Sequence, residues 1–258
     1  MAYDNKHKAL LQQIIEKGVM LNEEAQRLTV KLFDNDNVLL FANVLNSKLQ
    51  TLNMEVKSVT CELSGDKYWM LSSTVQYDVA KCQTEFSPGE LQLLRKIFTI
   101  IIESDTGSVS SINCLNLCSS LKSELSISNA QDFLTKMVEL KYLFLKDGIF
   151  FMGVRSIGEL MPYFRAYYEQ DTFHTCFLCK QVIFHGNKCA HCDVTLHLYC
   201  LENFGRLHNP TKCPNCKQPM SIGNSSDQDI VDEGATTLFT QESTSRKRST
   251  RKRPHTSR

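Results

Sequence analysis

Seven cysteines and one histidine lie close together toward the carboxyl end of the chain, in the spacing C-x2-C-x9-C-x2-C-x4-H-x2-C-x12-C-x2-C. A Cys-x2-Cys pair folds into a tight turn that places two thiolates on one tetrahedral zinc ion. The eight side chains therefore complete two four-ligand sites: Cys176, Cys179, Cys189, Cys192, His197, Cys200, Cys213 and Cys216. A zinc ion with four protein ligands has no position for water, so we expect two structural Zn²⁺ ions and no catalytic side chain.

Two pairings of these ligands are compatible with the spacing. In a cross-braced finger, Cys176, Cys179, His197 and Cys200 hold one ion and the other four cysteines hold the second. In a ribbon, neighbouring pairs join in order, so that residues 176–192 form a four-cysteine site. We favour cross-bracing, because the nine- and twelve-residue connections then span a common core and because His-x2-Cys after a four-residue gap is typical of RING-like and PHD-like fingers. Four further histidines are expected to stay unbound, since eight ligands already satisfy two ions: His174, His185, His191 and His208.

Three positions favour a RING finger that engages a ubiquitin-conjugating enzyme. They are Leu178 just before the second ligand, Pro214 just after the seventh and Lys217 just after the eighth. Leu178 and Pro214 would form an apolar pad for the enzyme, and Lys217 would donate hydrogen bonds to enzyme and ubiquitin. The alternative is purely local: a packed leucine, a proline that shapes the turn and a solvated lysine. A histone-reading PHD finger usually has a large aromatic residue where this chain has Thr211.

The composition indicates a soluble intracellular protein. With 42% apolar residues among 258, the chain can form one or two small domains beside a zinc finger. Residues 1–10 have no apolar run behind their charged side chains, so we expect neither a secretory signal nor a membrane span. Clustered cysteines in a reducing compartment bind metal far more often than they form disulfides. The remaining cysteines lie among apolar residues and are expected to be buried thiols: Cys61, Cys82, Cys114 and Cys118.

Two successive segments show the same order of helices and strands. Residues 10–52 carry apolar side chains at helical spacing in three stretches, and β-prone segments follow at 55–63 and 68–75 around a Ser-Gly-Asp-Lys turn. The order recurs from the helix start Ser87-Pro88-Gly89-Glu90, through helices near 112–121 and 130–141, to a hairpin at Asp147-Gly148. Three helices followed by a hairpin are the order of a winged helix.

We therefore predict an α+β chain of two tandem winged-helix domains followed by a cross-braced two-zinc finger. The predicted segments are winged-helix domains at 1–82 and 83–153, a connecting helix at 154–172, a C4HC3 RING-type zinc finger at 173–220 and a disordered basic tail at 221–258. The tail is rich in Ser, Asn, Asp and Thr, which cannot bury enough apolar surface to fold alone.

The net charge of +1 is unevenly distributed along the chain. Residues 246–258 hold seven of the 29 Lys and Arg residues and no acid, so the rest carries 22 basic and 28 acidic side chains, a net charge of −6. Such a body lacks the charge pattern of a duplex-binding protein, so we favour protein contacts for the winged helices and only a weak DNA contact at the basic end. The basic end also fits a nuclear import signal, with a plain solvated end as the alternative: Arg246, Lys247, Arg248, Arg251, Lys252 and Arg253.

Over residues 1 to about 220, the chain resembles the non-structural maintenance of chromosomes element 1 family. The resemblance rests on the segment Ile102-Glu103-Ser104-Asp105-Thr106-Gly107, the helix Asn113-x-Leu115-Asn116-Leu117 and the knuckles CFLC, CAHC, LHLYC and CPNC. Members of this family are RING subunits of the SMC 5/6 genome-maintenance complex. The resemblance implies a nuclear, chromosomal role in DNA repair by homologous recombination, with a MAGE-family subunit and a kleisin subunit as partners.

Three functions are compatible with this sequence. The first is a RING-type E3 ubiquitin ligase subunit that holds a loaded conjugating enzyme in a reactive orientation and is strengthened by its MAGE partner. The second is a structural subunit that binds the MAGE and kleisin partners without significant ligase activity. The third is a chromatin reader that uses the zinc finger as a PHD module. Leu178, Pro214 and Lys217 favour the first, and Thr211 disfavours the third.

Overall fold

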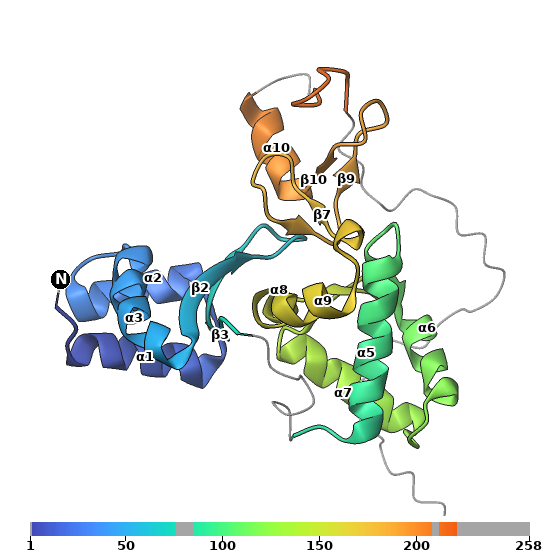
Figure 1. Cartoon of the computed structure of the whole chain (residues 1–258), viewed down its shortest axis with the longest axis horizontal. Coiled ribbons are helices and arrows are strands. Elements are labelled where there is room, and N and C mark those ends of the chain that lie inside the picture. Colours follow the sequence, from blue (N-terminus) through green and yellow to red (C-terminus); the bar gives the residue numbers. More distant parts are fainter. Residues whose placement is uncertain (1, 76–84, 208–211, 221–258) are drawn as a thin grey trace, which may run out of the picture. The chain divides into compact units, whose positions relative to one another are not determined.

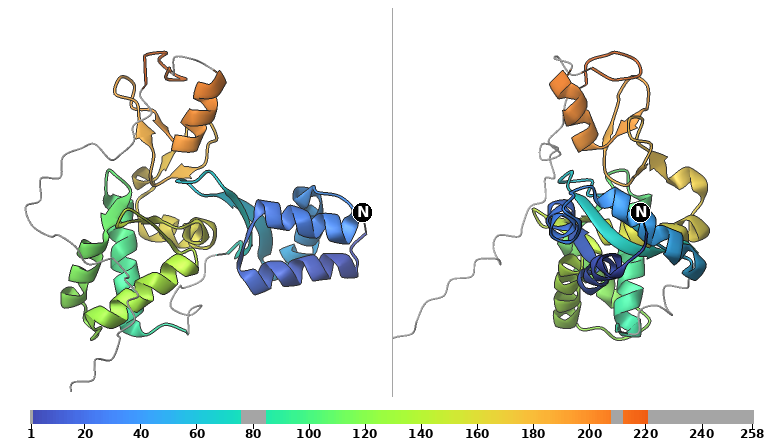
Figure 2. Two further views of the ribbon diagram at one scale, coloured as in Figure 1. Left: turned by 180° about the vertical axis from the view of Figure 1, so that it is seen from behind. Right: turned by 90° about the vertical axis from the view of Figure 1, so that its left-hand side faces the viewer.

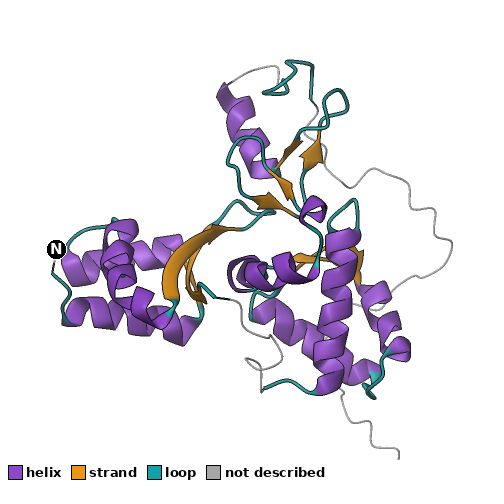
Figure 3. Cartoon of the chain, viewed as in Figure 1, coloured by secondary structure: helices purple, strands orange, loops and turns teal. Residues whose placement is uncertain are grey.

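Three apolar cores lie in the part of the chain that the structure describes. The computed structural model describes residues 2–75, 85–207 and 212–220 (Figure 1). One core belongs to residues 2–75, here called the first subdomain, and a second is built mainly by residues 85–168, the second subdomain. The third lies within residues 173–220, the zinc-finger region. Groups of helices are combined with small antiparallel sheets, which confirms the predicted α+β class (Figure 3).

Within residues 2–75, three α-helices pack beside a three-stranded antiparallel sheet of order β1-β3-β2. The elements are α1 (Asn5–Lys17), β1 (Val19–Leu21), α2 (Asn22–Phe33), α3 (Val38–Leu49), β2 (Met54–Thr60) and β3 (Lys67–Ser73). The β2–β3 hairpin pairs Met54 with Ser73 at one end and Thr60 with Lys67 at the other. Strand β1 was not predicted, because three residues between two helices are too few to show a period of two.

The bounds of α1 follow from its terminal residues. The Asp4 side chain accepts hydrogen bonds from the backbone N–H groups of Lys6 and His7, which satisfies donors that the first helical turn leaves free. Gly18 ends the helix with a φ of 68°, a left-handed conformation that suits glycine. The helix buries Leu10 and Ile14, four residues apart, in the first core.

The second subdomain repeats this order of elements. Within residues 85–152 the elements are α5 (Pro88–Glu103), β4 (Ser108–Ser110), α6 (Ser111–Asn116), the 3-10 helix η2 (Leu117–Ser120), α7 (Ile127–Glu139), β5 (Leu143–Lys146) and β6 (Ile149–Met152). Its sheet has the order β4-β6-β5, which matches β1-β3-β2 of the first subdomain. The predicted helix start is confirmed, since the Ser87 hydroxyl accepts from the N–H of Glu90 and the Glu90 carboxylate accepts from the N–H of Ser87.

The connecting helix predicted at 154–172 is wrong as a single element. The structure has two short helices, α8 (Val154–Glu159) and α9 (Met161–Tyr167), followed by a 3-10 turn, η3 (Gln170–Thr172). Pro162 has no N–H to donate to the carbonyl of Gly158, so the helix breaks between them. The Gly158 carbonyl accepts instead from the hydroxyl of Ser72 in β3, at 3.1 Å.

The zinc-finger region consists of two small hairpins and one helix. Strands β7 (His174–Thr175) and β8 (Val182–Ile183) pair, as do β9 (Asn187–Lys188) and β10 (Thr195–Leu196), and α10 (Leu198–Leu207) follows. Its core buries three of the predicted zinc ligands, Cys176, Cys189 and Cys213, among few other apolar side chains. Such a small core needs additional stabilisation to fold.

The β2–β3 hairpin reaches the zinc-finger region at its turn (Figure 2). The recurring order of helices and strands agrees with the winged-helix prediction, which stays a prediction, as do the predicted domain bounds. Of the helices in the described ranges, none is both long and apolar enough to cross a membrane. Cys82, His208, Thr211 and the predicted basic tail lie outside the described residues.

Candidate metal centre

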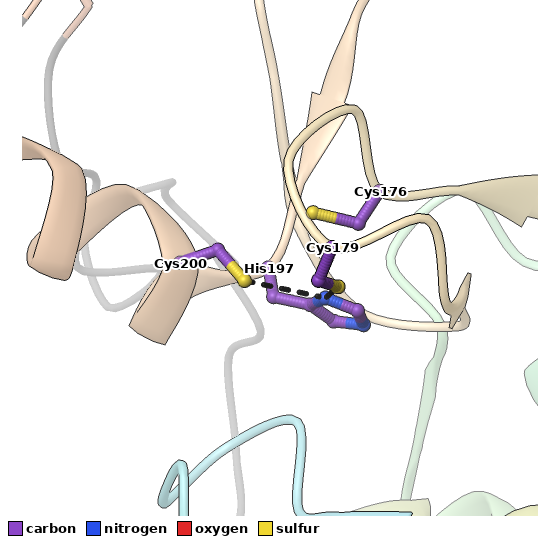
Figure 4. Close-up of side chains that lie close together, drawn as sticks. All are labelled: Cys176, Cys179, His197 and Cys200. Carbon is purple, nitrogen blue, oxygen red and sulfur yellow. Dashed lines mark hydrogen bonds between the residues drawn. The ribbon is translucent and has the colours of Figure 1, made fainter.

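The first cluster joins two chain segments that are separated by the second Cys-x2-Cys pair. Cys176 and Cys179 lie in the turn between β7 and β8, His197 follows β10 and Cys200 lies in the first turn of α10. One ligand atom from each lies within 4.8 Å of the others. The Nδ1 atom of His197 faces the sulfurs, 3.3 Å from Cys179 Sγ and 3.9 Å from Cys200 Sγ (Figure 4).

The second cluster is built from cysteines alone. Cys189 and Cys192 lie in the turn after β9, and Cys213 and Cys216 lie beyond α10, with all four sulfurs within 4.8 Å. Sγ–Sγ distances are 3.7 Å between Cys189 and Cys216 and 3.5 Å between Cys192 and Cys213. Each cluster takes one pair from each half of the sequence motif. Cross-bracing is therefore confirmed and the ribbon alternative is wrong.

The three Cys-x2-Cys turns share one backbone conformation. In each, the residue after the second cysteine has a positive φ: 59° at Lys180, 56° at Asp193 and 63° at Lys217. Its N–H donates to the carbonyl of the first cysteine, at 2.9 to 3.2 Å. This turn points two sulfurs to the same side, which a tetrahedral metal requires.

The geometry of both clusters fits zinc. With Zn–S bonds of about 2.3 Å, a tetrahedral site has S–S edges of about 3.8 Å, close to the distances in the second cluster. Cys176, Cys189 and Cys213 are buried and the remaining cysteine ligands are half-buried, so little of either site is open to water. Zinc would be held by three thiolates and one imidazole in the first site and by four thiolates in the second.

The electrostatics of the first cluster also favour a cation. Burial opposes ionisation of Cys176, but hydrogen bonds from His197 and from backbone N–H groups lower the pKa of this thiol to about 6. Burial and the negative charges of Cys176 and Cys179 raise the pKa of Cys200 to about 12. A divalent ion at the centre would remove this mutual repulsion and allow all three thiolates to form.

Two family models match the chain, one over most of the first and second subdomains and one over the zinc-finger region. One, described as the Nse1 non-SMC component of the SMC5-6 complex, matches residues 7–160, more than half of the chain. The chain belongs to the Nse1 family. A second model, of a RING-like domain, matches residues 176–216, the interval from the first predicted ligand to the last.

Curated Nse1 relatives are similar over most of their length. The non-structural maintenance of chromosomes element 1 homolog of Homo sapiens is 32% identical over 218 residues, covering 81% of this chain and 82% of the relative. The Schizosaccharomyces pombe protein is 24% identical over 219 residues, covering 83% of this chain and 91% of the relative. A chain in the solved structure of an Nse1-Nse3-Nse4 complex is 30% identical, with a TM-score of 0.73 over 85% of this chain and 98% of that chain.

The nearby histidines of this Nse1-family chain take other roles. His174 and His191 are exposed, and neither belongs to a ligand cluster in the described ranges. His185 is buried, with Nδ1 2.7 Å from the Thr106 carbonyl oxygen and its ring against Phe151. That these histidines bind no metal stays a prediction.

The predicted contacts for a conjugating enzyme lie in two of the three Cys-x2-Cys turns. Pro214 is half-buried and Lys217 is exposed, and the Lys217 ammonium donates to the Pro214 carbonyl at 2.9 Å. Leu178 is half-buried against the zinc-finger core, and its neighbour Phe177 is 36% exposed. The structure thus links Pro214 with Lys217. The apolar pad that Leu178 and Pro214 would share stays a prediction.

Sequence reasoning missed one charged residue beside the first zinc site. Glu62, at the turn of the β2–β3 hairpin, is only 4% exposed and contacts the zinc-finger region. The sequence feature that could have indicated this contact is a single acidic residue between two apolar ones, Cys61 and Leu63. Its partners lie more than 120 residues away in the sequence, at a separation that no local pattern reports.

Proposed function

We propose that this Nse1-family chain is a RING-type E3 ubiquitin ligase subunit of the SMC5-6 complex, acting in DNA repair by homologous recombination. The observation that carries the proposal is the RING-like match over a cross-braced pair of closed zinc clusters, with Leu178, Pro214 and Lys217 on their turns. The zinc ions would shape the surface and take no part in bond making. The finger would hold a loaded conjugating enzyme so that a substrate lysine attacks the thioester.

The proposed partners follow from the similar solved structure. Its name joins Nse1 with Nse3 and Nse4, which correspond to the MAGE-family and kleisin partners expected from the resemblance. The first subdomain offers exposed apolar side chains for such contacts, including Leu39 at 56% and Leu52 at 66% exposure. Exposed apolar side chains on a helix suit a protein surface better than a phosphate backbone. We propose that these subdomains are winged helices that contact protein partners.

Ubiquitin discharge tests the ligase proposal. The full chain, with its MAGE partner, would be mixed with a ubiquitin-loaded conjugating enzyme, and thioester loss would be followed for wild type, Leu178→Ala and Lys217→Ala. We expect both substitutions to slow discharge at unchanged zinc content. Lys188→Ala is the matched control, because this exposed lysine lies on β9 and is not one of the predicted contacts. Discharge at the wild-type rate in both variants would exclude this mechanism.

A purely structural role is the second candidate. Two observations favour it: the Lys217 ammonium is engaged by a carbonyl of its own turn, and Cys192 occupies a ligand position where RING fingers usually have histidine. A single ammonium also lacks the forked geometry of arginine. If Lys217→Ala and Leu178→Ala retain partner binding but the wild type shows no discharge, the scaffold function replaces the ligase function.

Nuclear, chromosomal localisation is part of the proposal. It rests on the family and on two basic triplets: Arg246, Lys247, Arg248, Arg251, Lys252 and Arg253. Replacing all six by alanine in a fluorescent fusion should shift the protein from the nucleus to the cytoplasm. Unchanged nuclear signal in cells that lack the partner subunits would show that import does not use these residues.

A further inference from the structure

Glu62 is a buried carboxylate that the first subdomain supplies to the zinc-finger region. It lies in the turn between β2 and β3 and is 4% exposed. Its Oε1 atom accepts a hydrogen bond from the N–H of Phe184 at 2.9 Å, and Oε2 accepts from the N–H of His185 at 3.1 Å. A buried carboxylate is costly unless its oxygens are satisfied, so these contacts mark a built site.

The same carboxylate reaches a zinc ligand. Glu62 Oε1 lies 3.3 Å from Nε2 of His197, and the carbonyl oxygen of Val182 lies 3.1 Å from that nitrogen. The other ring nitrogen, Nδ1, faces the sulfurs of Cys179 and Cys200. With Nδ1 directed at the metal position, Nε2 carries the proton and donates to both oxygens.

We propose that Glu62 is a positioning residue for the zinc site formed by Cys176, Cys179, His197 and Cys200. Acceptance of the Nε2 proton holds the imidazole in the tautomer and orientation that direct Nδ1 to zinc, and the carboxylate makes the ring a better donor. A residue of the first subdomain thus completes a site whose ligands all come from residues 176–200. This role of Glu62 does not depend on ubiquitin transfer.

The second zinc cluster lies outside this arrangement. Its ligands are Cys189, Cys192, Cys213 and Cys216, whereas the polar contacts of Glu62 described above are with Phe184, His185 and His197. The two sites therefore provide an internal comparison in one molecule. A loss of Glu62 should weaken zinc binding at the first site and leave the second unchanged.

Metal retention in the full chain tests the proposal. Zinc release to an excess of chelator would be timed for wild type, Glu62→Ala and Glu62→Gln. Cobalt substitution would report the three-thiolate, one-imidazole site separately from the four-thiolate site through their different absorption bands. We expect Glu62→Ala to speed release from the first site roughly 10- to 100-fold, as loss of such outer contacts typically does.

Two further variants sharpen the test. Glu62→Gln should fall between Ala and wild type, because its carbonyl oxygen can still accept from His197 while its amide faces the N–H of His185. Glu55→Ala is the matched control, since Glu55 lies on β2 of the same hairpin with its side chain 38% exposed. Its release rates should equal those of wild type. Wild-type release from the first site in Glu62→Ala, or equal acceleration at both sites in Glu62→Gln, would overturn the proposal.

Discussion

Single residues carry much of the stability of the zinc-finger region. A structural zinc ion contributes an apparent ~10 to 16 kcal/mol of folding free energy, whereas burial of one large apolar side chain contributes ~1.5 to 3 kcal/mol. The apolar core of this region is small, with Ile183, Leu196, Leu201 and Met220 as its buried members beside the cysteines. Loss of one ligand is therefore expected to unfold the region.

His197→Ala should abolish the first zinc site and unfold residues 173–220. The substitution removes one of four ligands and leaves three cysteines whose thiolates repel one another. Bound zinc measured by elemental analysis should fall below two equivalents, and proteolysis should cut the zinc-finger region rapidly. His191→Ala is the control, because this exposed histidine lies outside the clusters and its loss should change neither result. Two bound equivalents in His197→Ala would contradict the assigned ligand set.

Cys114 should resist alkylation while the protein is folded. Burial raises the pKa of this thiol to about 12, so at pH 8 roughly one molecule in ten thousand carries the reactive thiolate. Iodoacetamide at pH 8, followed by peptide mass mapping, should leave Cys114 unmodified until denaturant is added. Raising the pH toward 12 increases the thiolate fraction, so any labelling of the folded protein should become faster as the pH rises. Rapid labelling of the folded protein at pH 8 would show that the Cys114 thiol on α6 is accessible to the reagent.

At the scale of elements, the loop between α5 and β4 fixes the zinc-finger region to the second subdomain. The carbonyl of Thr106 accepts from the ring of His185, and Gly107, with a φ of 63°, lies against the backbone of Phe184. A Cβ at Gly107 would overlap the carbonyl oxygen of Phe184. The turn at residues 184–185 therefore contacts Glu62 on one side and this loop on the other.

Gly107→Ala should destabilise the protein more than Gly148→Ala. Both glycines have positive φ, which costs an alanine about 1–2 kcal/mol, but a Cβ at Gly148 meets only the Ser111 hydroxyl at 3.8 Å. Overlap with Phe184 should add a further ~1–3 kcal/mol at Gly107. Chemical denaturation of both variants measures the difference. Equal unfolding free energies would show that the loop does not contact residues 184–185 in solution.

At the scale of the whole molecule, separate cores make the zinc-finger region the part that depends on metal. The first and second subdomains bury their own apolar side chains, among them Phe41 and Trp69 in one and Ile97 and Phe133 in the other. Neither set includes a zinc ligand. Removal of zinc should therefore unfold the zinc-finger region before the two subdomains.

A strong chelator should unfold residues 173–220 and leave the helical subdomains folded. Hydrogen exchange followed by mass spectrometry should show fast exchange in β7 to α10 and continued protection in α1, α3, α5 and α7. Restored zinc should restore protection. Parallel loss of protection in α3 and α5 would show that the three cores fold as one cooperative unit. Acidification should mimic the chelator, since protons compete with zinc for the thiolates.

Much of this architecture was predictable because its signals are local. The helix start at Ser87 and Glu90 is confirmed, as is the cross-braced pairing of the zinc ligands, because capping and ligand spacing each act within a short stretch of chain. The break between α8 and α9 also has a local cause in Pro162, which the prediction of one helix from the apolar spacing of residues 157–168 did not include. Strands β1 and β4 were too short to predict and depend on the hairpins they join.

The sequence by itself determined the candidate ligands, their number and most of the helices and the two hairpins within residues 5–152, because each depends on neighbours along the chain. Only the tertiary structure decided what surrounds the first zinc site. Glu62 reaches His197 through the β2–β3 hairpin, and Gly107 reaches Phe184 through the loop after α5. Contacts between residues so distant in sequence form only when the three cores pack together. The spacing of residues along the chain does not indicate which surfaces then meet.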